Sequence, residues 1–363
     1  MEIFLISAVA LLSAANGAND NFKGVATLWG SGRTTYIRGL AWATAFTFLG
    51  SLASCWLASG LVEKFNGSRI LAHPGVSQPA FLAAVALAAA ATVILASLLG
   101  LPVSTTHALT GSLVGAGIVA GGVANVRYGV LAQGVVAPLL FSPLAALLLT
   151  LSLYPLVTRF AARAASRDCL CVDSPEGVAL PFADGAASVA IRLPALRVAA
   201  SEECRTGMEI VRMTFSGALH WLSAAAISFA RGVNDTPKIV ALMLFAAGGG
   251  VVLNYALVAA AMAAGGMLGA ARVARTMSKK ITSMDTREAV TANLVSAGLV
   301  TLASGWALPV STTHVTSGSI FGIGLLHRVE ADWHRVREIL LAWVATLPLA
   351  TALAMLFFSL LAR

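Results

Sequence analysis

Apolar runs long enough to cross a membrane constrain this chain more than any other feature of its sequence. They occupy 39–61, 79–100, 129–158, 251–270 and 338–361, and about 18–20 apolar residues suffice to span a bilayer as an α-helix. Charged residues make up only 11% of the chain, whereas soluble proteins carry roughly 25%. The sequence therefore predicts an all-α polytopic membrane protein that resides in a lipid bilayer.

The N-terminal stretch MEIFLISAVALLSAANGA has the apolar core and small residues of a signal peptide. It carries Glu2 and no Lys or Arg, although a signal peptide begins with positive charge. We therefore interpret it as the first membrane helix. The net charge of +8 comes from basic residues in short loops between apolar runs, so it does not predict a nucleic-acid partner.

Two motifs occur twice, once in each half of the chain. PVSTTHALTGSLVGAG at 102–117 returns as PVSTTHVTSGSIFGIG at 309–324, and NGANDNFK at 16–23 returns as RGVNDTPK at 231–238. The offsets are 207 and 215 residues, which predicts a duplicated unit. The predicted parts are a first membrane repeat at 1–158, a polar cytoplasmic linker loop at 159–206 and a second, inverted membrane repeat at 207–363.

Within the linker, CVDSPEGVALPF and ASVAIRL predict a small β-hairpin. Its cysteines Cys169, Cys171 and Cys204 lack the paired spacing of a zinc site. We expect no cofactor and no catalytic residue in the chain.

Each half contains five predicted membrane segments, and an odd number inverts the second half relative to the first. The segments are 1–30, 39–61, 79–100, 102–122 and 129–158, then 208–246, 251–270, 288–307, 309–327 and 338–361. With the N-terminus outside, ten Lys and Arg fall in cytoplasmic loops and three in outer loops, as the positive-inside rule requires. Inverted repeats with broken helices are typical of secondary transporters, whose site lies at the midplane.

The first duplicated motif predicts that a helix breaks at the midplane in each half. Gly17 and Gly232 suit the left-handed conformation that ends a helix. The residues that follow would start a new helix: Asn19 or Asp20 would cap it in the first copy, and Asp235 or Thr236, ahead of Pro237, in the second.

The second motif predicts two more helix N-termini, beginning at Pro102 and Pro309. Such ends offer free N–H groups and about half a positive charge, which together bind oxyanions. The hydroxyl groups of the two motifs would add donors for a tetrahedral anion. The alternative is that they bond back to carbonyls of their own helix. These hydroxyls belong to Ser104, Thr105, Thr106, Ser311, Thr312 and Thr313. The GxxxG spacing that follows in each copy predicts close packing against another helix.

Ionisable residues inside a membrane are functional candidates. Asp20 with Lys23, and Asp235 with Lys238, are spaced to share a helix face, either as part of a binding site or as structural ion pairs. The charges of these four residues sum to zero, so the site would not neutralise the charge of an entering dianion. Burying such an unpaired ion is costly. Co-bound cations, or protons on His107 and His314, would neutralise the anion. The need for them predicts coupled symport. Each histidine has the alternative role of a donor that holds its own loop.

The duplicated Asn-Asp motifs and PVSTTH motifs resemble those of the inorganic phosphate transporter (PiT) family, over both halves of the chain. The resemblance implies an inverted-repeat fold and symport of inorganic phosphate with Na⁺ or H⁺. The implied anion ligands are Ser104, Thr105, Thr106, Ser311, Thr312 and Thr313, with Lys23 and Lys238. The implied cation ligands are Asn19, Asp20, Asn234 and Asp235, with Na⁺ at Asp20 and Asp235, supported by Asn16, Gly17, Arg231, Gly232, His107 and His314.

This sequence departs from the family pattern at Lys23, where many members have a neutral residue, and at Arg231, where many have His. An ammonium at position 23 would compete with Na⁺, which leaves the coupling ion open. Sulfate is the alternative substrate, because some bacterial relatives carry it. A membrane hydrolase is disfavoured, because it needs one nucleophile and one base rather than a symmetric pair. A passive anion channel is also disfavoured, because acidic residues would be costly in an anion pore. We expect a multi-pass protein of the cell (inner) membrane, compatible with a homodimer.

Overall fold

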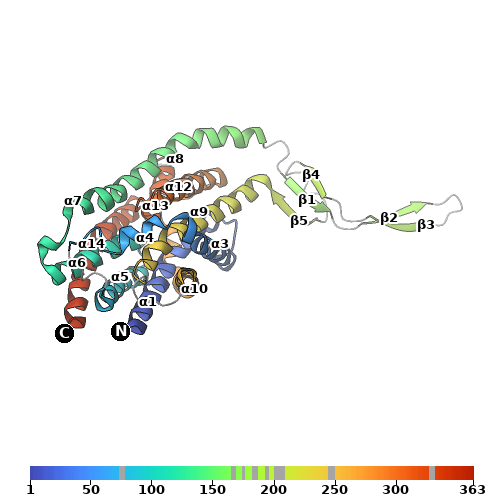
Figure 1. The fold of residues 1–363 in the computed structure, drawn as a ribbon. Coiled ribbons are helices and arrows are strands. Elements are labelled where there is room, and N and C mark those ends of the chain that lie inside the picture. The colour runs from blue at the N-terminus through green and yellow to red at the C-terminus, as the bar shows by residue number, and fades with distance from the viewer. Residues whose placement is uncertain are drawn as a thin grey trace.

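The computed structural model describes residues 1–72, 78–164, 169–173, 176–181, 187–192, 196–199, 209–243, 250–326 and 332–363. Most of these residues form a bundle of helices, and a group of short strands lies beyond one end of it (Figure 1). The predicted helical class is confirmed for the bundle.

The helices fall into two sets in chain order. The first set consists of α1 (Glu2–Asp20), the 3₁₀ helix η1 (Asn21–Val25), α2 (Ala26–Gly30), α3 (Tyr36–Leu57), α4 (Gly60–Phe65), α5 (Pro79–Leu99), α6 (Thr105–Gly121), the 3₁₀ helix η3 (Val123–Asn125), α7 (Tyr128–Leu131), the π-helical turn η4 (Ala132–Val136) and α8 (Ala137–Ala164). The second set consists of α9 (Phe215–Val240), α10 (Val251–Gly269), α11 (Ala271–Lys279), α12 (Thr286–Gly305), α13 (Thr312–Leu326) and α14 (Trp333–Leu361).

Local sequence determines where several of these helices begin and end. Helix α12 opens with a capping box, in which the side chains of Asp285 and Glu288 each accept a hydrogen bond from the other residue's backbone N–H. Helix α5 has Pro79 in its first turn and ends at Gly100, whose φ of 71° is left-handed.

Six helices in the described part of the chain are long and apolar enough to span a membrane, which supports the multi-pass prediction. They are Glu2–Gly30, Tyr36–Leu57, Pro79–Leu99, Tyr128–Phe160, Val251–Gly269 and Trp333–Leu361. The other four predicted segments contribute α6, α9, α12 and α13, which bury polar side chains. The membrane segment predicted at 208–246 begins too early, because 209–214 form a strand and the helix starts at Phe215.

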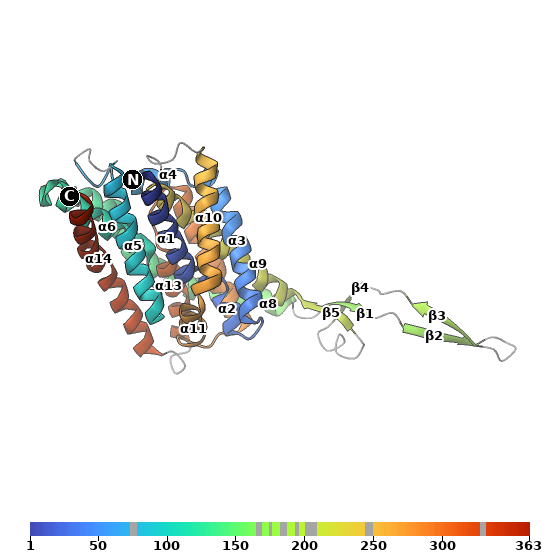
Figure 2. The same cartoon turned by 90° about the horizontal axis from the view of Figure 1, so that it is seen from below.

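The polar linker contributes four of the five strands in the described part of the chain, and the fifth, β5, lies just after it. Strand β1 (Cys169–Asp173) pairs antiparallel with β4 (Leu196–Ala199) and β5 (Glu209–Thr214), while β2 (Glu176–Pro181) pairs antiparallel with β3 (Ala187–Arg192). The β2–β3 pair confirms the predicted hairpin over 176–181 and 187–192. Residues 171–173, which the prediction included, belong to β1 in the other sheet instead, and 174–175, 182–186 and 193 lie outside the described residues. Figures 1 and 2 show both sheets beyond the ends of α8 and α9, away from the bundle.

The helices of the two sets pack in matching pairs. Helix α1 packs on α10 and α5, and its counterpart α9 packs on α3 and α12; likewise α6 packs on α14, and α13 on α8. Thr44, early in α3, donates to Met267 Sδ, late in α10, at 3.7 Å. Ser51, later in α3, and Met262, earlier in α10, both accept from Thr236 Oγ1, so these two counterparts run antiparallel (Figure 2). This arrangement is consistent with an inverted repeat.

Small residues allow these helix pairs to approach closely. A Cβ on Gly115 would collide with the backbone of Thr351 in α14, and one on Gly318 would collide with that of Pro143 in α8. Both glycines belong to the duplicated GxxxG spacing, whose predicted packing role is confirmed.

Candidate anion-binding site

The two PVSTTH stretches each lead into a buried helix N-terminus. The side chain of Ser104 accepts a hydrogen bond from the N–H of His107, and Ser311 accepts one from His314, both at 3.2 Å. These serines are therefore N-caps, and the helices begin at the next residues, Thr105 and Thr312. The predicted helix starts at Pro102 and Pro309 were three residues too early, because the chain remains non-helical until the capping serine.

The predicted helix breaks are wrong at Gly17 and Gly232. Helix α1 continues through Gly17 to Asp20 and then tightens into a 3₁₀ turn, and α9 continues through Gly232 and Pro237 to Val240. The capping roles predicted for Asn19, Asp20, Asp235 and Thr236 therefore do not occur. Only the first copy is interrupted.

The two glycines have a different structural role. A Cβ on Gly17 would lie 2.8 Å from Gly266 N in α10, and one on Gly232 would lie 2.6 Å from Ser51 N in α3. Such distances are shorter than real Cβ contacts. The glycines are required because two backbones approach each other there, next to the charged residues of each motif.

Lys23 connects the first Asn-Asp motif to the second PVSTTH motif. Its side chain is 2% exposed, and its ammonium forms an ion pair with Asp20. It also donates to Asn19 Oδ1 at 2.9 Å, Val103 O at 3.2 Å and Thr313 Oγ1 at 2.6 Å. The last of these contacts crosses from one half of the chain to the other.

Lys238 makes the reciprocal connection. This lysine, 1% exposed, donates to Thr106 Oγ1 at 2.8 Å and to Val310 O at 2.7 Å, and its Nζ lies 3.6 Å from Asp235 Oδ1. Each half thus sends a lysine to the threonine of the other half. The backbone carbonyls of Val103 and Val310 were missed by sequence analysis, since no side chain signals them.

The two carboxylates accept hydrogen bonds from the first threonine of each PVSTTH helix. Thr105 Oγ1 donates to Asp20 at 3.3 Å, and Thr312 Oγ1 donates to Asp235 at 3.4 Å. Asn16 Nδ2 lies between the carboxylates, 3.0 Å from Asp20 Oδ2 and 3.5 Å from Asp235 Oδ2. The structure therefore brings both motifs of both halves into one cluster.

Arg231 adds a third cation to this cluster. It is 1% exposed, donates to Asn16 Oδ1 at 2.6 Å and Asn21 Oδ1 at 2.9 Å, and its Nε lies 3.6 Å from Asp235. Sequence analysis counted two lysines and two aspartates. With Arg231 charged, the formal sum becomes +1 rather than zero; the i, i+4 spacing of Arg231 and Asp235 was the available signal.

Asn19 and Asn234 hold the loops that precede the PVSTTH helices. Asn19 accepts from Val103 N at 3.1 Å and donates to Leu101 O at 3.0 Å. Asn234 donates to Val310 O at 3.2 Å and accepts from Ser304 Oγ at 3.1 Å. These amides position the backbone carbonyls that receive the two lysines.

The two histidines face each other across the halves. His107 Nδ1 contacts Trp343 O, and His314 Nδ1 contacts Leu139 O, each at 3.2 Å. Because a carbonyl only accepts, each Nδ1 must carry the proton. The rings meet edge to face, with centroids 4.6 Å apart. Each histidine therefore ties its helix to the opposite half, rather than holding its own loop.

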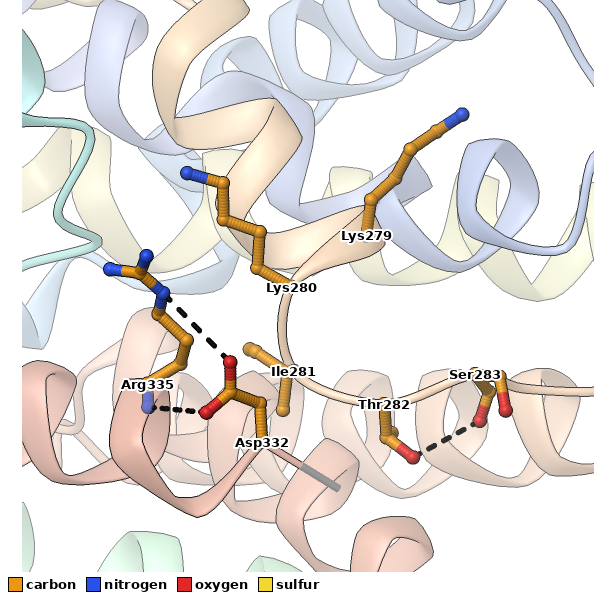
Figure 3. Close-up of a pocket in the computed structure, with 7 residues that line it drawn as sticks. All are labelled: Lys279, Lys280, Ile281, Thr282, Ser283, Asp332 and Arg335. Carbon is orange, nitrogen blue, oxygen red and sulfur yellow. Dashed lines mark hydrogen bonds and ion pairs between the residues drawn. The ribbon is translucent and has the colours of Figure 1, made fainter. Parts of the chain in front are cut away.

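A polar hollow lies at the surface, apart from the central cluster. It has a volume of about 340 Å³ and is lined by Lys279, Lys280, Ile281, Thr282, Ser283, Asp332 and Arg335. Figure 3 shows Arg335 paired with Asp332, and the Lys279 ammonium lies 4.7 Å from the centroid of the Trp29 ring. Both lysines are exposed, so this pocket lacks the buried, mutually bonded groups of the central cluster.

Comparison with known protein families matches almost the whole chain. The sequence profile described as the phosphate transporter family matches residues 16–354. The chain belongs to the phosphate transporter family. Its members are transporters, and the six candidate spans agree with a multi-pass membrane transporter.

Individual relatives match over most of their length. The inorganic phosphate transporter 2-1, chloroplastic, of Arabidopsis thaliana is 30% identical over 94% of this chain and 69% of the relative. A probable low-affinity inorganic phosphate transporter of Bacillus subtilis (strain 168) is 26% identical over 97% of this chain and 96% of the relative. The solved structure titled "The sodium-dependent phosphate transporter" has the same fold, with a TM-score of 0.76, 19% identity, and coverage of 99% of this chain and 98% of that one.

Proposed function

We propose that this protein is a secondary active transporter that carries inorganic phosphate across the membrane in symport with Na⁺ or H⁺. One observation supports this most: two buried lysines cross between the halves at two helix N-termini, each bonded to a threonine hydroxyl. Ammonium groups, hydroxyls and helix N-termini are the donors that an oxyanion requires. The substrate named for the curated relatives is phosphate.

The proposed anion ligands are Ser104, Thr105, Thr106, Ser311, Thr312, Thr313, Lys23 and Lys238. Entry of phosphate would replace the threonine oxygens as acceptors for the two ammonium groups. The proposed cation ligands are Asn19, Asp20, Asn234 and Asp235, with Asn16, Gly17, Arg231, Gly232, His107 and His314 in support.

Sulfate is the alternative substrate, and the carboxylates favour phosphate over it. Asp20 and Asp235 both lie in the cluster and only accept hydrogen bonds while ionised. Phosphate at neutral pH carries a proton that it can donate to a carboxylate, whereas sulfate carries none.

Transport would proceed by alternating access about the shared cluster. Because helices of 1–158 pack on helices of 207–363 in pairs, the moving parts would be these mixed helix pairs rather than the two halves as separate bodies. Residues 159–206 would serve as a cytoplasmic linker outside the transport unit. We further propose a location in the cell (inner) membrane and compatibility with a homodimer.

The test is uptake of labelled phosphate into proteoliposomes that contain the purified protein, under a Na⁺ gradient and, separately, a pH gradient. We expect gradient-driven uptake that excess unlabelled sulfate does not inhibit. Entry of labelled sulfate but not phosphate would reject phosphate as the substrate and favour the alternative.

A further inference from the structure

The oxygen atoms around Lys23 form the kind of shell that transporters use to bind Na⁺. Its ammonium contacts one carboxylate (Asp20), one amide oxygen (Asn19), one backbone carbonyl (Val103) and one hydroxyl (Thr313). Backbone carbonyls and polar oxygens near the midplane are typical Na⁺ ligands in such folds. Here an ammonium group of the chain itself occupies the centre of that shell.

The second half repeats this arrangement. The Lys238 ammonium contacts a hydroxyl (Thr106), a backbone carbonyl (Val310) and, at 3.6 Å, a carboxylate (Asp235). The lysines and aspartates are related by the 215-residue offset, and the valines and threonines by the 207-residue offset. Both matching cation positions are therefore filled in the same way.

The charge of the cluster makes an additional cation unnecessary. Lys23, Lys238 and Arg231 supply three positive charges against two from the aspartates, and all five side chains are buried. A singly charged phosphate is neutralised by this +1 without a co-bound ion. A Na⁺ ion entering the Lys23 shell would instead meet an ammonium on the same oxygens, so these residues do not fit Na⁺.

We infer that the Lys23 ammonium replaces a coupling Na⁺ in this transporter, with Lys238 in the matching position, so that phosphate uptake does not require Na⁺. This inference rests on the proposed function. It concerns the chain's own residues and separates this protein from relatives whose names state sodium dependence, such as sodium-dependent phosphate transporter 2 of Cricetulus griseus.

The first test is phosphate uptake into proteoliposomes under an inward proton gradient, with external Na⁺ replaced by N-methylglucamine at equal concentration. We expect the two initial rates to agree within about twofold. A rate that falls by more than this without Na⁺ overturns the inference. Absence of uptake with either cation contradicts the proposed function instead, and the inference is then decided by the second test.

The second test is thermal unfolding of the purified protein in NaCl against N-methylglucamine chloride at equal ionic strength, which needs no transport. We expect no Na⁺-specific rise in Tm for the wild type. Lys23→Asn leaves the oxygen shell without its ammonium and should gain such a rise, because an ion that binds only the folded state stabilises it.

Lys280→Asn removes an exposed ammonium and serves as the matched control, with no expected gain. Lys238→Asn repeats the test in the second half if Lys23→Asn does not fold. A Na⁺-specific rise in the wild type, or none in either variant of the buried lysines, overturns the inference.

Discussion

Replacing Gly17 with alanine tests whether the close approach of α1 and α10 positions the site. A Cβ at this position would lie 2.8 Å from Gly266 N and closer still to Met262 O, and both atoms belong to backbone that cannot rotate away. The helices would have to separate, and overpacking of this kind costs about 1–3 kcal/mol. Alanine also favours a helix over glycine by roughly 1 kcal/mol, so the variant needs a control that shares this gain.

Gly298→Ala provides that control, because Gly298 lies inside α12 and a Cβ there would meet nothing within 4 Å. The difference between the two variants is then the cost of overpacking alone. At roughly 2 °C per kcal/mol for a chain of this length, Gly17→Ala should unfold about 2–6 °C below Gly298→Ala. The assay is thermal unfolding of both purified proteins in the same detergent. Equal Tm values would refute the close-approach role of Gly17.

Three further predictions address the second half, the threonines and the histidines. Gly232→Ala should lower Tm as Gly17→Ala does, because its Cβ would meet the α3 backbone, and the same unfolding assay checks it. Thr105→Val should raise the KM for phosphate uptake roughly 10- to 100-fold, since hydrogen bonds to charged groups contribute about 1.5–3 kcal/mol. Thr105→Ser should keep the KM of the wild type, and equal KM values in Thr105→Val and the wild type would contradict the prediction. His314→Asn should keep much of the uptake because its amide can donate to Leu139 O, whereas His314→Phe should lose it; similar loss in both would argue against the donor role.

The sequence predicted the composition of the site better than its backbone. Lys23, Asp20, Lys238 and Asp235 were identified because charges are rare in apolar segments, and the structure places all four in one cluster. The glycine signal was ambiguous, since glycine suits both a helix end and a close approach of two helices. Only the neighbouring helix, which is distant in sequence, decides between these roles.

The contacts that the two lysines make with the opposite half of the chain could not be predicted from either motif alone. The spacing of Asp20 and Lys23 places them on one face, but does not show that Lys23 reaches Thr313 from the other half. The same applies to His107 and His314, whose carbonyl partners lie on α14 and α8. These partners are 236 and 175 residues away in sequence, where local pattern carries no information.

In the proposed mechanism, the crossed lysines would also connect phosphate binding to movement between the halves at the cluster. A motion that separated the halves would break the bond of Lys23 to Thr313 and that of Lys238 to Thr106. Charge-assisted hydrogen bonds of this kind contribute about 1.5–3 kcal/mol each, so the loss of these two bonds would cost about 3–6 kcal/mol unless other acceptors replaced the threonines. A phosphate bound between the ammonium groups supplies such acceptors, and a ligand shifts an equilibrium only through its different affinity for the two states. The same contacts that hold the halves together would thereby make their separation depend on the anion.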